Sequence, residues 1–258
     1  MTLLEYIISG SGFFAVSFVA AAVNSVAGGG TFLTFPVFIL GGLTALQANI
    51  MSTIALWPGV LASSYGYRSI ILATDKTVWR PFLIIGLIGG AAGAALLLMT
   101  PEIIFKTLVP WLLLLATLIF TFGHHGVALL KRLPSSDKSW LWAGLCFQMV
   151  IAIYGGYFGA GIGILTLAML QIMGFTHIHQ MNALKTVLTA AINAVTAMIF
   201  IFSGKVIWSL AVMMVAGAIC GGYTGARMAL KVSPKKVRLL VSFIGFAMSA
   251  YFFLYGVS

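Results

Sequence analysis

Long apolar segments follow one another along almost the whole chain, most of them about 20 residues long, the length with which an α-helix crosses the hydrocarbon core of a bilayer. Little polar material is left between them: 7% of the residues are charged, whereas a soluble domain carries about 25%. The alternating ten-residue segments of a transmembrane β-barrel are absent from the sequence. The sequence therefore predicts an all-α polytopic membrane protein that lies in a lipid bilayer.

Glycines interrupt one of these apolar stretches, which reads NSVAGGGTFLTFP at positions 24–36. A glycine in a helix interior costs about 1 kcal/mol relative to alanine, so three in a row predict a break. A second glycine-rich stretch, GGYFGAGIGIL, occupies positions 155–165. The apolar piece after each stretch has about 12 residues, hence about 18 Å as a helix, which is short of a core of about 30 Å. We therefore expect a helix break followed by a short helix at two places.

The two halves of the chain match when one is shifted by 133 residues. QANIMST at 47–53 then aligns with QMNALKT at 180–186, and Gly28 aligns with Gly161. Chance similarity between apolar helices is the alternative explanation, but a shared Gln-x-Asn-x-x-x-Thr is harder to explain in this way because polar residues are scarce here. Internal repeats are found in many transporter folds. The predicted organisation is a first repeat at 1–125, a basic cytoplasmic linker at 126–139 and a second repeat at 140–258.

Each predicted repeat contains five apolar segments. They lie at 5–26, 31–42, 45–67, 79–99 and 104–123 in the first half and at 140–158, 164–174, 177–203, 207–229 and 237–256 in the second. If every segment crosses the membrane, the loops around 68–80, 124–139 and 227–238 share one side. These loops hold 11 of the 14 basic residues, namely Arg68, Lys76, Arg80, Lys131, Arg132, Lys138, Arg227, Lys231, Lys235, Lys236 and Arg238. Basic loops face the cytoplasm, so we expect both termini outside and a location in the plasma (inner) membrane of a bacterium. Five crossings per half also invert the second repeat relative to the first.

The two breaks indicate where a substrate would bind, because transporters with inverted repeats bind substrate near the midplane at discontinuous helices. The short helices expected to begin at Thr31 and near Ile164 would each present unpaired N–H groups and a positive dipole end. Glycine lets a ligand approach the backbone closely, and helix N-termini favour anions. Close helix packing is the alternative role of glycine. We assign that role to Gly89, Gly90, Gly93, Gly221, Gly222 and Gly225.

A stripe of polar residues follows the second break. Its members recur at the spacing of one helix face and are Asn182, Lys185, Thr186, Thr189, Asn193 and Thr196. Such a stripe should face a cavity, because polar side chains are costly against lipid. Lys185 would attract or hold an anion there, and snorkelling to the membrane edge is the alternative. The predicted substrate-binding residues are Asn24, Gly28, Gly29, Gly30, Thr31, Asn49, Ser52, Thr53, Gly159, Gly161, Gly163, Gln180, Asn182, Lys185 and Thr186.

The positions of the acidic residues bear on the direction of transport. All four, Glu5, Asp75, Glu102 and Asp137, fall at or near predicted helix ends or loops. Pumps coupled to protons or cations usually place a carboxylate within the membrane, and an anion that leaves a negatively charged interior needs no such coupling. We therefore expect an anion exporter. A passive anion channel and an importer of a related anion are the alternatives.

Other classes of function receive little support. An intramembrane enzyme would need a Ser/His/Asp or metal constellation at depth, and no mid-membrane acid completes one, so no enzymatic activity, cofactor or metal is predicted. The net charge of +10 fits loops that face anionic lipid rather than a nucleic-acid partner. Cys146 and Cys220 lie in separate apolar segments and are interpreted as buried small side chains. The sequence makes no prediction of the oligomeric state.

The paired glycine motifs, in two halves separated by a basic loop, resemble those of the TauE/SafE-type sulfite exporter family. The resemblance extends from about residue 10 to 256. It implies membrane export, or in some members uptake, of small sulfur-containing anions and organic acids, including sulfite and sulfonates such as sulfoacetate. The family motifs map onto Asn24, Gly28, Gly29, Gly30 and Thr31 and onto Gly159, Gly161 and Gly163. Ile162 separates the last two glycines, so the second motif departs from a triple glycine.

Overall fold

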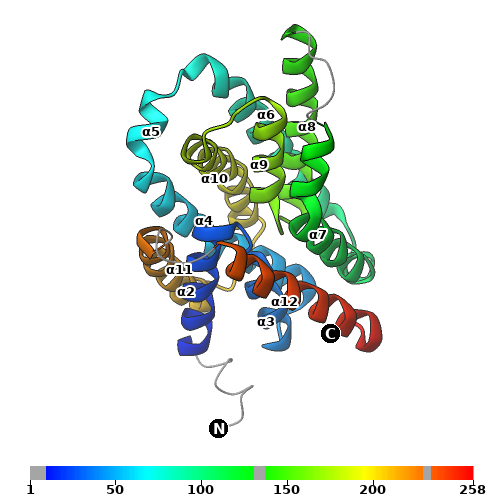
Figure 1. Cartoon of the computed structure of the whole chain (residues 1–258). Coiled ribbons are helices and arrows are strands. Elements are labelled where there is room, and N and C mark those ends of the chain that lie inside the picture. Colours follow the sequence, from blue (N-terminus) through cyan, green and yellow to red (C-terminus); the bar gives the residue numbers. More distant parts are fainter. Residues whose placement is uncertain (1–9, 131–136, 229–233, 258) are drawn as a thin grey trace.

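The computed structural model describes residues 10–130, 137–228 and 234–257, and all regular secondary structure in these ranges is helical (Figure 1). The helices are α2 (Gly10–Ala27), α3 (Thr31–Leu40), α4 (Ala45–Gly66), α5 (Arg68–Ala73), α6 (Lys76–Met99), α7 (Glu102–Leu130), α8 (Asp137–Tyr157), α9 (Ile162–Ile172), α10 (Ile178–Phe202), α11 (Trp208–Met228) and α12 (Pro234–Tyr255). In Figure 1, α2, α3, α11 and α12 gather in the lower part, and α6, α8, α9 and α10 in the upper part. The predicted all-α fold is confirmed.

Six of these helices, α4, α6, α7, α10, α11 and α12, are long and apolar enough to cross a membrane, and α2, α3, α8 and α9 are shorter apolar helices. Each of these ten helices overlaps with one of the ten predicted segments, but α7 continues to Leu130, seven residues beyond the expected end and into the predicted linker. The short helix α5 was not predicted and lies within the loop expected around 68–80. Lys131, Arg132 and Lys231, which were used to predict the orientation, and Glu5, which was used to predict the direction of transport, lie outside the described residues.

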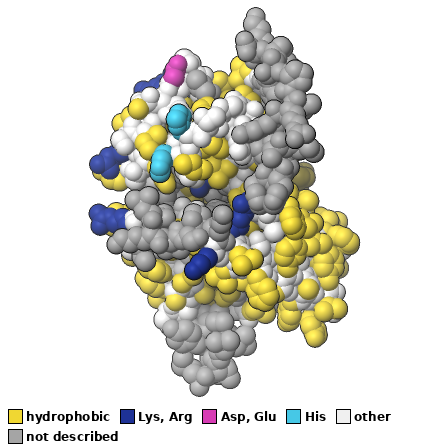
Figure 2. All heavy atoms as spheres, in the orientation of Figure 1, with side chains coloured by type: hydrophobic (Ala, Val, Ile, Leu, Met, Phe, Trp, Pro, Cys, Tyr) yellow, Lys and Arg dark blue, Asp and Glu magenta, His cyan; other side chains and the backbone are white. Residues whose placement is uncertain are grey.

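The outer surface of the bundle is largely apolar. Figure 2 shows hydrophobic side chains over a broad part of one face, with few charged side chains among them. Cys146 and Cys220 are both free and exposed on this protein surface. Their interpretation as buried side chains was therefore wrong, because an apolar helix in a membrane can expose small residues to lipid as readily as it buries them.

Glycines allow two helix pairs to pack at very short range. A Cβ atom at Gly221 of α11 would lie 2.0 Å from the carbonyl oxygen of Phe18 on α2, and one at Gly93 of α6 would lie 2.1 Å from that of Ile153 on α8. Real side chains do not tolerate such distances, so these positions need glycine. The same holds for the other four glycines to which a packing role was assigned, and that prediction is confirmed.

The packing of the helices follows the division of the sequence into two halves. The helix α2 packs on α11, and its counterpart α8 packs on α6; likewise α4 packs on α11 and α10 on α6. Exchanging the halves therefore preserves most of the neighbouring pairs, although the contacts of α4 with α7 and of α2 with α12 have no counterpart of similar extent. The helices α4 and α10 meet each other at the centre. The two repeats at 1–125 and 140–258 stay a proposal with which this pattern agrees. Their inverted relation and the linker at 126–139 stay proposals.

Aromatic side chains hold the short helix α3 and the second break in place. The ring of Phe32 meets Phe120 of α7 edge to face with centroids 5.2 Å apart, and Phe35 meets Phe158 in the same geometry at 5.2 Å. All four rings are buried. Edge-to-face pairs add about 0.5–1.5 kcal/mol each beyond their burial, so the core fixes the two breaks relative to each other.

Candidate functional site

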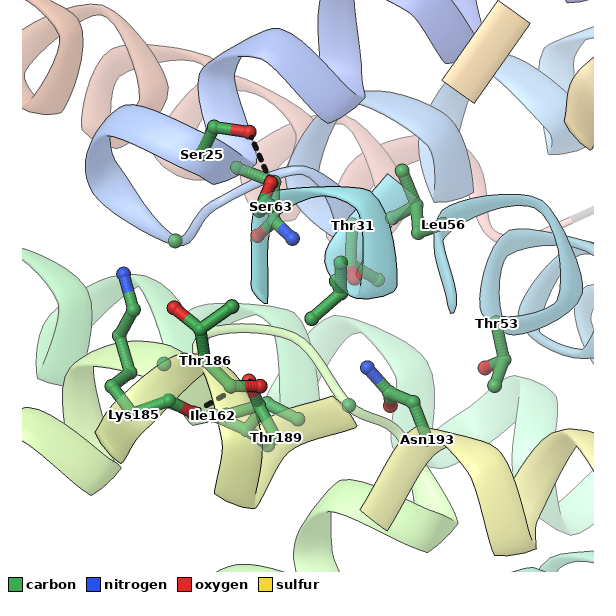
Figure 3. Close-up of a pocket in the computed structure, with 15 residues that line it drawn as sticks. Ser25, Thr31, Thr53, Leu56, Ser63, Ile162, Lys185, Thr186, Thr189 and Asn193 are labelled. Atoms are coloured by element: carbon green, nitrogen blue, oxygen red, sulfur yellow. Dashed lines mark hydrogen bonds between the residues drawn. The ribbon is translucent and has the colours of Figure 1, made fainter. Parts of the chain in front are cut away.

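A small pocket lies where α4 and α10 meet the two helix breaks. Its volume is about 40 Å³, and its lining residues are Asn24, Ser25, Gly28, Thr31, Thr53, Leu56, Val60, Ser63, Gly159, Ile162, Gly163, Lys185, Thr186, Thr189 and Asn193. Figure 3 shows Lys185, Thr186, Thr189 and Asn193 along one side and Ser25, Ser63, Thr31 and Leu56 along the other. Both halves of the chain therefore contribute to a single space.

Lys185 on α10 brings the positive charge of the pocket. The side chain is 6% exposed, and in Figure 3 its ammonium points across the pocket toward the first break. Its stem runs beside α9, with Cδ 3.6 Å from the position that a Cβ atom would take at Gly163. Within the described ranges, the ammonium has no hydrogen-bond or ion-pair partner. The structure thus places Lys185 in an internal pocket and not on the outer surface of the bundle.

The backbones of the two breaks approach each other beside this lysine. A Cβ atom at Gly163 would lie 3.4 Å from the Cα of Gly28. Gly28 has φ +80° and Gly159 has φ +79°, values that side chains rarely permit, so glycine is needed for both turns. The helix α9 begins at Ile162, two residues before the expected start, and α3 begins at Thr31 as predicted. First-turn N–H groups have no partner within their own helix, so α9 can offer those of Ile162 and Gly163 to an anion beside Lys185.

The threonine hydroxyls that α10 contributes to the pocket are engaged within their own helix. Thr186 donates to the carbonyl oxygen of Asn182 at 2.6 Å, and Thr189 donates to that of Lys185 at 2.8 Å. An anion would therefore have to draw these donors away from existing bonds. The side-chain amide of Asn193 makes no hydrogen bond within the described part of the chain, and it remains available to a ligand.

Serine hydroxyls form the opposite wall and tie three helices together. Ser25 of α2 and Ser63 of α4 share a hydrogen bond of 2.9 Å, shown in Figure 3. Ser25 also lies 3.1 Å from the carbonyl oxygen of Gly222 on α11. The amide oxygen of Asn24 accepts a bond of 3.3 Å from the N–H of Gly30 and so bridges the first break. Hydrogen bonds between helices therefore fix the serine wall, whereas the Lys185 side chain has no such bond among the described residues.

About half of the predicted site residues come together in this pocket. They are Asn24, Gly28, Thr31, Thr53, Gly159, Gly163, Lys185 and Thr186. The other predicted residues, which do not line it, are Gly29, Gly30, Asn49, Ser52, Gly161, Gln180 and Asn182. The structure thus separates the glycines and polar residues that the sequence grouped together.

Packing and internal hydrogen bonds explain why the others lie elsewhere. A Cβ atom at Gly29 would lie 2.7 Å from the side chain of Val241, and one at Gly30 would lie 2.7 Å from the carbonyl oxygen of Ala20. Gly161, with φ +77°, is the N-cap of α9.

Two of the polar residues are bonded elsewhere in the protein. The side-chain amide of Asn49 donates to the carbonyl oxygen of Tyr157 at 2.9 Å, and Ser52 shares a short hydrogen bond with Thr34 of α3. Gln180 and Asn182 lie in the first turns of α10. These seven residues support the breaks or flank the pocket.

Several pocket residues were not among the predicted set. They are Ser25, Leu56, Val60, Ser63, Ile162, Thr189 and Asn193. Thr189 and Asn193 belong to the polar stripe, so the spacing of that stripe could have identified them as pocket residues. Leu56 and Val60 are apolar, but they stand 133 positions before Thr189 and Asn193. Projecting the stripe onto the first half would have identified them.

Comparison with known proteins identifies the family. The family model described as "Sulfite exporter TauE/SafE" matches residues 13–252. The chain belongs to the TauE/SafE family. A "Probable membrane transporter protein" of Haemophilus influenzae is 28% identical over 243 residues, which cover 92% of this chain and 91% of that protein. YfcA of Escherichia coli K12, a "Probable membrane transporter protein", is 25% identical, with 92% and 87% covered. ORF9 of Sinorhizobium sp, described in the same words, is 24% identical, with 92% and 89% covered.

These comparisons show a membrane transporter of the TauE/SafE type, which is not a class of enzyme. Membership covers nearly all of the described helices, from α2 to α12. No solved structure matches the chain.

Proposed function

We propose that this TauE/SafE protein exports small sulfur-containing or organic anions, such as sulfite or a sulfonate like sulfoacetate, through the pocket between the two helix breaks. The name of the matching family, sulfite exporter, supports a sulfur oxyanion as substrate. The relatives described as probable membrane transporters support transport as the activity.

The unpartnered ammonium of Lys185 is the observation that carries this proposal. A buried charge is costly unless it is paired, and a substrate anion would supply the missing partner. The N-terminal turn of α9 adds N–H groups and a positive dipole end at the same place. Two independent sources of positive potential therefore converge on one small space.

The distribution of acidic residues supports export as the direction. Within the described ranges, Asp75 is the N-cap of α6, Glu102 stands in the first turn of α7 and Asp137 begins α8. A carboxylate that could carry a coupling proton within the membrane is thus absent from these ranges. With the cell interior negative, each exported negative charge gains about 2.3 kcal/mol per 100 mV. An importer would work against this gradient.

Counterflow in proteoliposomes tests the proposal. Vesicles that contain the protein and unlabelled sulfite should accumulate labelled sulfite from outside, and the rate should saturate with concentration. Lys185→Ala should abolish this uptake, whereas Lys205→Ala, which removes an exposed lysine of the same charge, should not. Uptake that never saturates, together with single-channel currents, would instead identify the passive channel. Net uptake against the membrane potential would identify the importer.

Cysteine labelling tests the proposed inner-membrane orientation with both termini outside. Cys146 and Cys220 are exposed, so they must first be replaced by alanine. A membrane-impermeant reagent applied from outside should then label a cysteine at position 205 and should not label one at position 76. The reverse pattern would overturn the orientation and leave the anion site unaffected.

A further inference from the structure

The two long helices that line the pocket present unlike walls. Thr189 and Asn193 of α10 are polar, and the residues at the same positions of α4, 133 places earlier, are Leu56 and Val60. Both apolar side chains are buried, with exposed fractions of 4% and 5%. Between Thr53 and Ser63, the α4 wall therefore presents hydrocarbon to the substrate where α10 presents hydrogen-bonding groups.

The space between these walls is small. A water molecule needs about 10–15 Å³ of cavity volume measured in this way, so a pocket of about 40 Å³ holds roughly three waters. That is on the scale of an oxyanion head group with a few non-hydrogen atoms. The chain of an organic anion would need space that Leu56, Val60 and Ile162 now fill.

Leu56 is backed by packed helices and cannot easily move aside. It belongs to a buried cluster with Ala20, Ala21 and Ala218, which joins α2, α4 and α11. Its Cδ1 atom also lies 3.2 Å from the position that a Cβ atom would take at Gly30. Cores of this density transmit strain and resist added volume. A longer substrate would therefore have to disturb the contact between α2 and α11.

We propose that Leu56 and Val60 act as a size filter. They restrict this protein to compact oxyanions with no organic tail or with a tail of at most one carbon. The inference rests on the proposed function and narrows it, because it favours sulfite over longer sulfonates such as sulfoacetate. Lys185 and the start of α9 bind the head group, and the α4 wall excludes the tail.

A series of sulfonates with one head group and increasing tail length tests the filter. Methanesulfonate, ethanesulfonate and propanesulfonate carry the same charge, so differences in affinity report the tail alone. Isothermal titration calorimetry on the purified full-length protein, with sulfite as a further ligand, measures each Kd. One methylene changes binding to a shaped apolar pocket by roughly 10- to 200-fold. We expect propanesulfonate to bind at least about tenfold more weakly than methanesulfonate.

Variants of the α4 wall identify the residues responsible. Leu56→Ala should bring the Kd of propanesulfonate about tenfold closer to that of methanesulfonate, because it opens space for the tail. Val60→Ala should act in the same direction and provides a second variant if Leu56→Ala folds poorly. Leu61→Ala is the matched control: Leu61 lies on the same helix, is 44% exposed and does not line the pocket. Its ratio of affinities should equal that of the wild type.

The outcomes of these experiments distinguish the size filter from the proposed anion transport on which it rests. A wild-type protein that binds all tail lengths equally would overturn the size filter and leave anion transport standing. Unchanged ratios in both wall variants would show that Leu56 and Val60 do not set the limit. Failure of every anion to bind, in a protein that remains folded, would overturn the proposed function and the filter together.

Discussion

The two helix breaks look alike in sequence but are stabilised in different ways. The first break is packed so tightly that a Cβ atom at Gly29 would overlap the side chain of Val241. One hydrogen bond, from the N–H of Gly30 to Asn24, bridges this break. The second break is held by hydrogen bonds, since Asn49 and Tyr154 donate to the carbonyl oxygens of this turn at 2.9 Å and 2.8 Å. A glycine motif therefore predicts where a helix breaks, but not which glycine faces the ligand.

The long helices α4 and α10 also differ, although their sequences align. Ser52 of α4 and Lys185 of α10 stand at matching positions, 133 residues apart. Ser52 is bonded to Thr34 within the protein, whereas Lys185 opens on the pocket. The polar side chain of the first half is thus bonded within that half, whereas the one of the second half is charged and faces the pocket. The helices α4 and α10 contact each other, and of these two positions only Lys185 lines the pocket.

The largest effect is expected at Gly163, the glycine where the second break faces the first. A Cβ atom there meets the Cα of Gly28 at an ordinary contact distance of 3.4 Å, so the backbone tolerates a side chain. The two further methyl groups of Gly163→Val would enter the space between Gly28 and Lys185. We expect calorimetry to detect no anion binding by a protein that still folds, a loss of at least about 100-fold, since a filled pocket excludes the ligand.

Gly29→Val provides the contrast for this prediction. Its Cβ atom would lie 2.7 Å from Val241 and 2.9 Å from Phe120, so the substitution forces α7 and α12 apart. Overpacking of this kind costs about 1–3 kcal/mol. The thermal midpoint should fall while the affinity of the folded fraction changes little. If Gly29→Val abolishes binding at unchanged stability and Gly163→Val does not, the assignment of the two glycines is reversed.

The next largest effect is expected at Lys185. Removing one charge-assisted hydrogen bond costs about 1.5–3 kcal/mol, so Lys185→Ala should weaken sulfite binding roughly 10- to 150-fold by calorimetry. Lys185→Arg should restore part of the affinity, because a planar guanidinium keeps the charge but not the shape of an ammonium. Ser52→Ala, at the matching position, should reduce stability and leave the Kd within about twofold, since Ser52 lies outside the pocket. Equal affinities of wild type and Lys185→Ala would mean that the lysine does not bind the anion.

Periodicity and composition predicted most of the fold, because a lipid environment leaves few alternatives to apolar helices. The ten segments, the break at Gly28 and the start of α3 at Thr31 agree with the structure. The helix α5 was not predicted, since six residues between two long helices show no clear period. The exposure of Cys146 and Cys220 was missed for a related reason: hydropathy does not distinguish a lipid-facing side from a buried one.

The pocket could be predicted only in part. Lys185 and Thr186 followed from the polar stripe, and Gly28 and Gly163 followed from the motifs. Asn49, which aligns with Asn182, was predicted to bind substrate, but its amide donates to the backbone of the other half. The sequence does not reveal which of several acceptors a buried donor will find, since that depends on packing between helices far apart in the chain. Leu56 and Val60 went unnoticed because apolar residues are the rule in this composition.

The smallest effect is expected from Asn49 and Asn182, which stand at the same position of the two halves. Asn49 is 1% exposed and its amide donates to the carbonyl oxygen of Tyr157, so Asn49→Ala leaves a buried acceptor unpaired at a cost of about 1–3 kcal/mol. The side chain of Asn182 has no hydrogen bond in the part of the chain that the structure describes, so Asn182→Ala should change stability by less than about 0.5 kcal/mol. Thermal unfolding of both variants in one detergent measures the difference, and Asn49→Leu, which has a similar size but no donor, separates the hydrogen bond from packing. Equal stabilities of Asn49→Ala and Asn182→Ala would mean that the second break does not depend on this bond, and that packing holds both breaks.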